Sequence, residues 1–317
     1  MVYTRHAVRC CALCAVGTLS KLVMSNAGTL GLNMDEILDG RVYYRSENQF
    51  SRSFAELNSL RRNEQLCDVI LVVEGERLPA HRVILASLSA YFRAMFTGKM
   101  AESTQREIVI NDIEPGTLRA LVDYAYTAAI WLTQENVQSI LPAASALQFD
   151  EVKEACSQFL LRQLDADNCL GIKGFADVHG CNHLPSAASI YSSHYFSQVR
   201  KQDEFLKLPL DEVKDFLGSD QLNIGTEYEV FEAAMEWLNH NGGERVQYLY
   251  EILSLIRLPL LSAEQLLKMV GQNTLIKSNP LCVELLMEAI QCHMLPDTRL
   301  KVRAPFHVSS ISAHCSQ

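Results

Sequence analysis

The sequence predicts an α+β domain, a small sheet flanked by helices, followed by an all-α domain built of helical hairpins. Two short runs in the first half, 69–73 and 108–110, are apolar and rich in β-branched residues, which is typical of buried strands. Beyond about residue 165 such runs disappear, and apolar residues recur at helical spacing with short links between the helices. The polar residues 165–168 are the expected boundary between the two domains.

Length, charge and composition narrow the class of protein. A chain of 317 residues fits about two domains, and its 48% apolar and 21% charged residues are those of a globular protein. A net charge of −9 without a basic stripe argues against a nucleic-acid partner. No apolar run has the length of a membrane span. Ten scattered cysteines indicate reduced thiols, so we expect a cytoplasmic protein, with the nucleus as the alternative.

The two ends of the chain carry no clear core pattern. Arg5 and Arg9 precede a modest apolar run at 10–19, which allows either a signal peptide or a leader without structure. We favour the second, because Arg9 interrupts the run and Lys21 closes it. We therefore expect residues 1–45 to be a disordered leader and residues 304–317 to be a disordered tail.

One apolar stripe precedes the strands of the first domain. Phe50, Phe54, Leu57 and Leu60 recur at helical spacing and predict an amphipathic helix. A helix of this kind must bury its stripe against something. The stripe either packs on its own domain or meets a second copy of the chain.

The central elements of the first domain follow one another closely. Strand 69–73 passes through a polar turn into a second short strand at 77–79. Helices are expected at 80–87 and 91–96, and a further strand at 106–113.

Three helical patterns complete the first domain. Pro115 lies near the first turn of one of them, where its missing N–H costs little. Pro142 lies inside the second, at 137–147, and we expect it to kink or divide that helix. The third runs from 152 to 164, so the first domain is expected to span 46–164.

Helical patterns account for the second domain. Thr226 with Glu229, and Ser262 with Gln265, have the spacing of capping boxes that begin helices. Asn241-Gly242-Gly243 ends the first of these helices in the expected way. The apolar faces lie at 170–178, 187–195, 210–217, 230–238, 249–256 and 281–289.

Two sets of short motifs stand out in the two domains. The first domain contains Cys67-Asp68-Val69, Ala80-His81-Arg82-Val83-Ile84-Leu85-Ala86, Tyr91-Phe92 and Ala94-Met95-Phe96-Thr97-Gly98. By these residues it resembles a BTB (POZ) domain in the form found in Kelch-like proteins. The second domain contains Asn168-Cys169-Leu170-Gly171-Ile172, Phe175-Ala176, Gly180-Cys181, Trp237 and Arg257-Leu258-Pro259-Leu260-Leu261. By these residues it resembles the BACK domain that follows BTB in Kelch-like proteins. Together the two resemblances cover about residues 46–303, with BTB at 46–164 and BACK at 165–303.

The resemblance implies a cullin-3 contact after the second short helix. Met100-Ala101-Glu102 matches the hydrophobic-x-Glu motif by which BTB adaptors hold cullin-3, and Phe96 is expected to join it. An apolar anchor beside a charged hydrogen-bonding group is suitable chemistry for a binding hot spot. The alternative is an ordinary solvated loop. The first BACK helices, 168–196, resemble the 3-box region that extends this contact.

The resemblance also implies a dimer, with Phe50, Phe54, Leu57 and Leu60 at the two-fold axis. Asp68 and His81 are expected nearby, as part of a buried charged contact that is satisfied only when both partners are present. The alternative for this pair, with Arg82, is acid–base catalysis, which we consider less well supported.

No other pattern in the sequence indicates catalysis, a cofactor or a metal. Phosphate-binding, dinucleotide-binding, nucleophile-elbow and zincin motifs are missing. His179, Cys181, His183 and His194 are suitable zinc ligands by type but lack a Cys-x-x-Cys partner, and Cys11 with Cys14 has no second pair. Gly171-Ile172-Lys173-Gly174 is interpreted as a place of close helix packing and not as a nucleic-acid clamp.

We therefore expect a non-enzymatic, substrate-adaptor-type subunit of a cullin-3 RING ubiquitin ligase. Its partners would be cullin-3, itself or other Kelch-like BTB proteins, and an unknown protein substrate. A Kelch-like protein would continue into a β-propeller of repeats near 50 residues long, and residues 304–317 contain none. The alternatives are a truncated form, or a regulatory or scaffold form that pairs with Kelch-like proteins or occupies cullin-3 without delivering a substrate.

Overall fold

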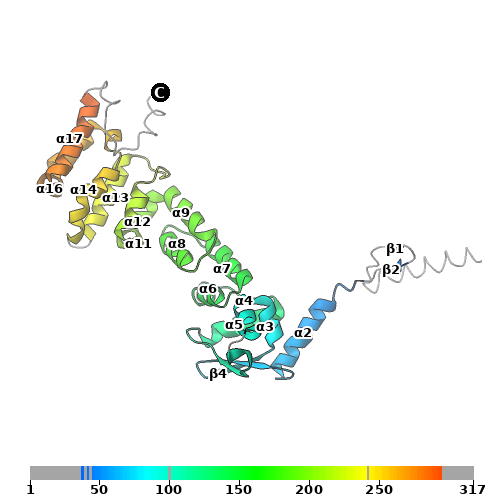
Figure 1. Cartoon of the computed structure of the whole chain (residues 1–317). Coiled ribbons are helices and arrows are strands. Elements are labelled where there is room, and N and C mark those ends of the chain that lie inside the picture. Colours follow the sequence, from blue (N-terminus) through cyan, green and yellow to red (C-terminus); the bar gives the residue numbers. More distant parts are fainter. Residues whose placement is uncertain (1–36, 39–40, 43–44, 99–100, 241–242, 295–317) are drawn as a thin grey trace, which may run out of the picture. The chain divides into compact units, whose positions relative to one another are not determined.

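The computed structural model describes residues 37–38, 41–42, 45–98, 101–240 and 243–294 (Figure 1). The expected tail lies outside these ranges. The expected leader, residues 1–45, lies outside them too, apart from residues 37–38, 41–42 and 45. By compactness the chain divides after Trp131 into two units. No helix within the described ranges is long and apolar enough to cross a membrane.

The first unit contains a three-stranded sheet in the order β4-β3-β5. Strand β3 (Val69–Val73) pairs antiparallel with β4 (Glu76–Ala80) and parallel with β5 (Glu107–Val109). Alternate side chains of β3 are buried, as expected for a strand with one face on the core. The two residues between β3 and β4, Glu74 and Gly75, both have positive φ angles, which a tight two-residue hairpin requires. A separate hairpin pairs β1 (Ile37–Leu38) with β2 (Arg41–Val42).

Helices pack on this sheet to form the core of the first unit (Figure 1). Leu71 of β3 is fully buried together with Leu85, Phe92 and Leu118 of three helices. The four helices confirm the predicted positions, whereas the short 3-10 turn η1 lies in a segment expected to be a loop. These elements are α2 (Gln49–Arg62), α3 (Arg82–Leu88), α4 (Ala90–Thr97), η1 (Ala101–Ser103) and α5 (Pro115–Thr127).

Every described element of the second unit is helical, as the periodicity predicted. The longer helices are α6 (Val137–Ala146), α7 (Asp150–Arg162), α8 (Cys169–Val178), α9 (Leu184–His194), α12 (Leu210–Leu217), α13 (Glu227–His240), α14 (Leu249–Leu255), α15 (Ala263–Gln272) and α17 (Pro280–Met294). The short ones are α10 (Phe196–Val199), α11 (Asp203–Lys207), η2 (Glu244–Tyr248), η3 (Leu258–Leu260) and α16 (Thr274–Ser278).

Helix α6 corrects part of the sequence prediction, because Pro142 lies inside it without dividing it. Leu141 and Ala144, on either side of the proline, are fully buried. Their packing offsets the backbone hydrogen bond that proline cannot make. By compactness α6 and α7 group with the later helices, and the domain boundary placed after residue 164 stays a prediction.

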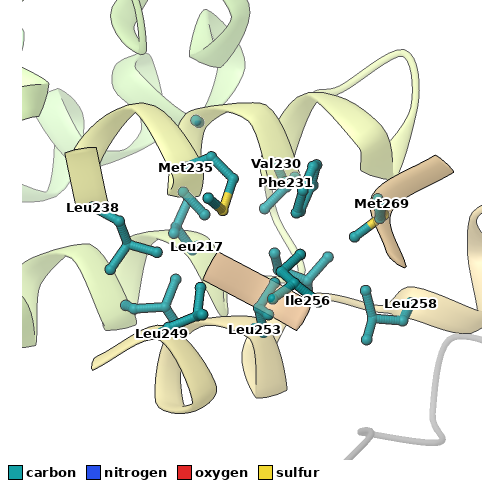
Figure 2. Close-up of a cluster of buried hydrophobic side chains, with 14 of the residues drawn as sticks. Leu217, Val230, Phe231, Met235, Leu238, Leu249, Leu253, Ile256, Leu258 and Met269 are labelled. Carbon is teal, nitrogen blue, oxygen red and sulfur yellow. The ribbon is translucent and has the colours of Figure 1, made fainter. Parts of the chain in front are cut away.

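A continuous apolar cluster forms the core of the later helices (Figure 2). Figure 2 shows Phe231 and Met235 of α13 on one side and Leu249 and Leu253 of α14 on the other. Trp237 is buried in the same cluster, and its indole N–H donates to the carbonyl of Leu208 at 3.0 Å. The Ser262 and Gln265 capping box predicted at the start of α15 is confirmed.

A buried ion pair fixes the break between α14 and α15. The Glu227 carboxylate, whose side chain is 4% exposed, accepts from the backbone N–H of Arg257 at 2.9 Å and lies 3.5 Å from its guanidinium. Arg257 also pairs with Asp220 at the surface. A carboxylate this deeply buried needs its partner, because an unpaired buried charge is very costly.

We predict that Glu227→Ala lowers the free energy of unfolding by about 3 kcal/mol, at the low end for a broken buried pair because Arg257 keeps Asp220. Urea denaturation followed by tryptophan fluorescence measures the loss. The control is Glu76→Ala, which removes a surface pair between half-buried Glu76 and exposed Arg119 and should cost less than about 1 kcal/mol. Equal losses in the two variants would contradict a structural role for the buried pair.

Candidate protein-interaction site

The loop from α4 to β5 carries the residues expected to bind a partner. Phe96, in the last turn of α4, is half-buried, and its ring stacks on Phe92 with centroids 5.6 Å apart. Glu102 lies in the single turn of η1 and is also half-buried. Met100 and the side chain of Ala101 lie outside the described residues.

Arg82, the first residue of α3, holds this loop. Its guanidinium donates to the carbonyl oxygens of Ser103 at 2.7 Å and of Gln105, and more weakly to that of Glu102 at 3.4 Å. The same group lies 5.0 Å from the centroid of the Phe96 ring, a cation–π distance. One side chain therefore contacts both ends of the candidate site.

The role of Arg82 was missed by sequence reasoning, which grouped it with Asp68 and His81. Its three carbonyl acceptors lie about twenty residues further along the chain, and backbone acceptors leave no mark on the sequence. The only available signal was an arginine at the start of a helix with no acidic residue one turn away.

Asp68 differs from the expectation for it. Its side chain is exposed in the single chain and accepts from the backbone N–H of Arg82 at 2.7 Å. The Asp68 carbonyl accepts from Arg82 Nε at 3.3 Å. The expected buried charged contact is therefore not made within one chain. Asp68 instead satisfies a free N–H at the start of α3, as a capping carboxylate does.

His81 is buried, but its partners are different. Its backbone N–H donates to the Tyr126 hydroxyl at 2.8 Å, and its Nδ1 lies 2.8 Å from the same oxygen. Its Nε2 lies 3.3 Å from the Gln65 carbonyl. An Nε2–H tautomer that accepts the Tyr126 proton satisfies all three groups. Burial raises the pKa of the Tyr126 phenol to about 12, so Tyr126 remains a donor.

These contacts give no support to acid–base catalysis by Asp68 and His81. Asp68 contacts the backbone of Arg82, whereas His81 contacts Tyr126 and Gln65. General acid–base chemistry would need the two groups to share a proton or a substrate position.

Helix α2 is anchored to the first unit by its polar residues. Arg61 is buried, donates to Asn58 Oδ1 at 3.0 Å and forms an ion pair with Asp123 of α5. Its guanidinium also lies 4.8 Å from the centroid of the Tyr126 ring. Asn58 and Arg61 are the buried residues of this helix.

The apolar stripe of α2 is largely uncovered within one chain. Phe50 is 69% exposed and Phe54 is 37% exposed, whereas Leu57 and Leu60 are half-buried. Packing on its own domain therefore accounts for the second half of the stripe only in part and leaves the two phenylalanines in water. Exposed aromatic side chains aligned on one helix face are typical of an interaction surface.

The structure describes four of the residues considered for zinc, His179, Cys181, His183 and His194, whereas Cys11 and Cys14 lie outside the described residues. Burial raises the pKa of the Cys156 thiol to about 12 and that of the Cys169 thiol to about 11, so both thiols stay protonated near neutral pH. Burial also lowers the pKa of His179, whose ring packs edge-on against Phe175. Within the described ranges no three His, Cys, Asp or Glu side chains are grouped to hold a metal ion.

Gly171 has a packing role at the start of α8. Its N–H donates to Glu204 Oε2 at 3.0 Å, and a Cβ at this position would lie 2.7 Å from Glu204 Oε1. A side chain here would displace Glu204. This observation supports close packing at Gly171, whereas a Cβ at Gly174 would meet nothing within 4 Å.

Two family models match the chain. The BTB/POZ domain model matches residues 57–164, and the BACK model (BTB And C-terminal Kelch) matches residues 169–271. Among solved structures the chain is similar to the BTB domain of zebrafish PATZ1, at 32% sequence identity. That match covers 38% of this chain and 98% of the zebrafish domain, with a TM-score of 0.35.

We predict that the chain is a dimer in light scattering at micromolar concentration and that Phe50→Glu/Phe54→Glu makes it a monomer. Burying each phenylalanine in a dimer contributes about 1.5–3 kcal/mol, and a charge there opposes association. The matched control is Ser59→Glu, an exposed position on the opposite face of α2 from Phe50, which should leave the dimer intact. A monomeric wild-type chain would contradict the interface.

Proposed function

The chain belongs to the BTB–BACK family, and we propose that it is a non-catalytic adaptor subunit of a cullin-3 RING ubiquitin ligase. The family matches confirm the resemblance to BTB and BACK domains and the fold class expected from the sequence. The two domains follow one another in the order found in Kelch-like proteins. These domains are typical of adaptor and scaffold proteins that act through protein–protein contacts.

The observation that carries the proposal is the held loop after α4. Phe96 and Glu102 are both half-buried and both contact Arg82, so an apolar ring and a carboxylate-bearing turn are kept at one edge of the BTB unit. A preformed contact of this kind lowers the entropy cost of binding. In the proposed complex, Met100 is the apolar anchor, Glu102 is the hydrogen-bonding partner, and Phe96 and Ala101 line the contact.

Two further features support an assembly of this kind. The uncovered stripe on α2 supplies a face for self-association or for pairing with another Kelch-like BTB protein. Helices α8 and α9, at the start of the BACK match, are proposed to extend the cullin-3 contact.

The proposed location of the protein is the cytoplasm, with the nucleus as the alternative.

We predict that Met100→Ala/Glu102→Ala weakens binding to purified cullin-3 by about 30-fold or more. This corresponds to the loss of at least about 2 kcal/mol expected for a hot-spot anchor. A pulldown with graded cullin-3 concentrations measures the change, and circular dichroism establishes that the variant is folded.

The matched control for this experiment is Glu64→Ala/Leu66→Ala. It removes a glutamate and a 79% exposed leucine two residues apart on another loop of the same unit. Its affinity for cullin-3 should equal that of the wild type. A folded Met100→Ala/Glu102→Ala variant with unchanged affinity would exclude this loop as the binding site.

A further inference from the structure

We propose that Arg82 is the positioning residue of the cullin-3 loop, holding the backbone of residues 102–105 so that Glu102 is presented beside Phe96. This inference rests on the proposed function, because it assigns a role to Arg82 in the contact proposed there. Arg82 acts through the loop and need not touch cullin-3 itself.

The Arg82 guanidinium supplies hydrogen bonds to the backbone of the loop. η1 is a single 3-10 turn of three residues, and turns of this length have weak hydrogen-bond geometry. The carbonyl groups of Glu102, Ser103 and Gln105 all accept from the Arg82 guanidinium. A guanidinium presents five N–H donors in one plane, so the backbone must curve around it to reach them.

Arg82 is itself well fixed. Its Nε donates to the Asp68 carbonyl and its backbone N–H to the Asp68 carboxylate, so it is tied to the residue that precedes β3. The helix that begins at Arg82 buries Ile84 and Leu85 in the core. Arg82 therefore attaches the loop to the sheet and to α3, which are the rigid parts of the unit.

The guanidinium also sets the distance between the two described contact residues. It covers the Phe96 ring at 5.0 Å while it binds the backbone of residues 102–105. A lysine could make one of these contacts but not the whole set, because its ammonium is a point charge without a planar fork. If Arg82 only stabilised the fold, its guanidinium would not need to contact both the Phe96 ring and the backbone of residues 102–105.

The experiment uses the full chain and the variants Arg82→Lys, Arg82→Gln, Glu102→Ala and the Arg82→Lys/Glu102→Ala combination. Affinity for purified cullin-3 is measured by calorimetry, and amide hydrogen exchange is measured along the BTB unit. Arg82→Lys is the variant that keeps the charge if Arg82→Gln does not fold. Arg119→Gln is the control, since it removes an arginine from an exposed ion pair in the same unit.

We expect Arg82→Lys to weaken cullin-3 binding about tenfold and to raise exchange only between residues 101 and 106. Because Arg82 acts through Glu102, the combined variant should bind no more weakly than Glu102→Ala alone. Arg119→Gln should match the wild type in both measurements.

Three results would overturn the inference. One is unchanged exchange in the loop of Arg82→Lys. Another is faster exchange throughout the BTB unit, which indicates a general structural role. The third is a combined variant whose loss is the product of the two single losses, which indicates independent actions. If the wild type does not bind cullin-3, the proposed function fails, and an exchange increase confined to the loop still supports the hold of Arg82 on it.

Discussion

A single guanidinium connects three segments of the BTB unit that are distant in the sequence. Arg82 begins α3, donates its backbone N–H to the Asp68 carboxylate, and donates from its guanidinium to carbonyls of the loop that leads to β5. Since β5 pairs with β3 in parallel, the chain must return to the start of the sheet after α4, and the loop makes that return. The same contact that completes the fold therefore also shapes the surface we assign to cullin-3.

Helix α2 likewise has one side that is attached to the BTB unit and another that is exposed. Arg61 holds its second half through Asp123 and the Tyr126 ring, and Tyr126 in turn satisfies the buried His81. The anchor is polar, which leaves the apolar side of the helix available for another molecule. Phe50 lies furthest from the anchor and is also the most exposed residue of the stripe. Both surfaces of the BTB unit thus combine exposed or half-buried groups with a supporting arginine that is buried or half-buried.

Much of the fold could be predicted from local patterns. The β-branched run at 69–73 identified β3, and the apolar spacing identified α2 and most later helices, because burial of one face sets the period of each element. The expected division of the helix at Pro142 was wrong, since tertiary packing on both sides of it outweighs one lost hydrogen bond. The partners of Asp68 and Arg82 could not be predicted, because backbone carbonyls and amides accept or donate whatever the residue type.

The most direct test is a calorimetric titration of the purified chain with purified cullin-3. The adaptor proposal predicts saturable binding of one cullin-3 per chain, with a dissociation constant of about 1 μM or tighter. The absence of heat and of any complex with cullin-3 at about 100 μM, from a chain with a native circular dichroism spectrum, would contradict it.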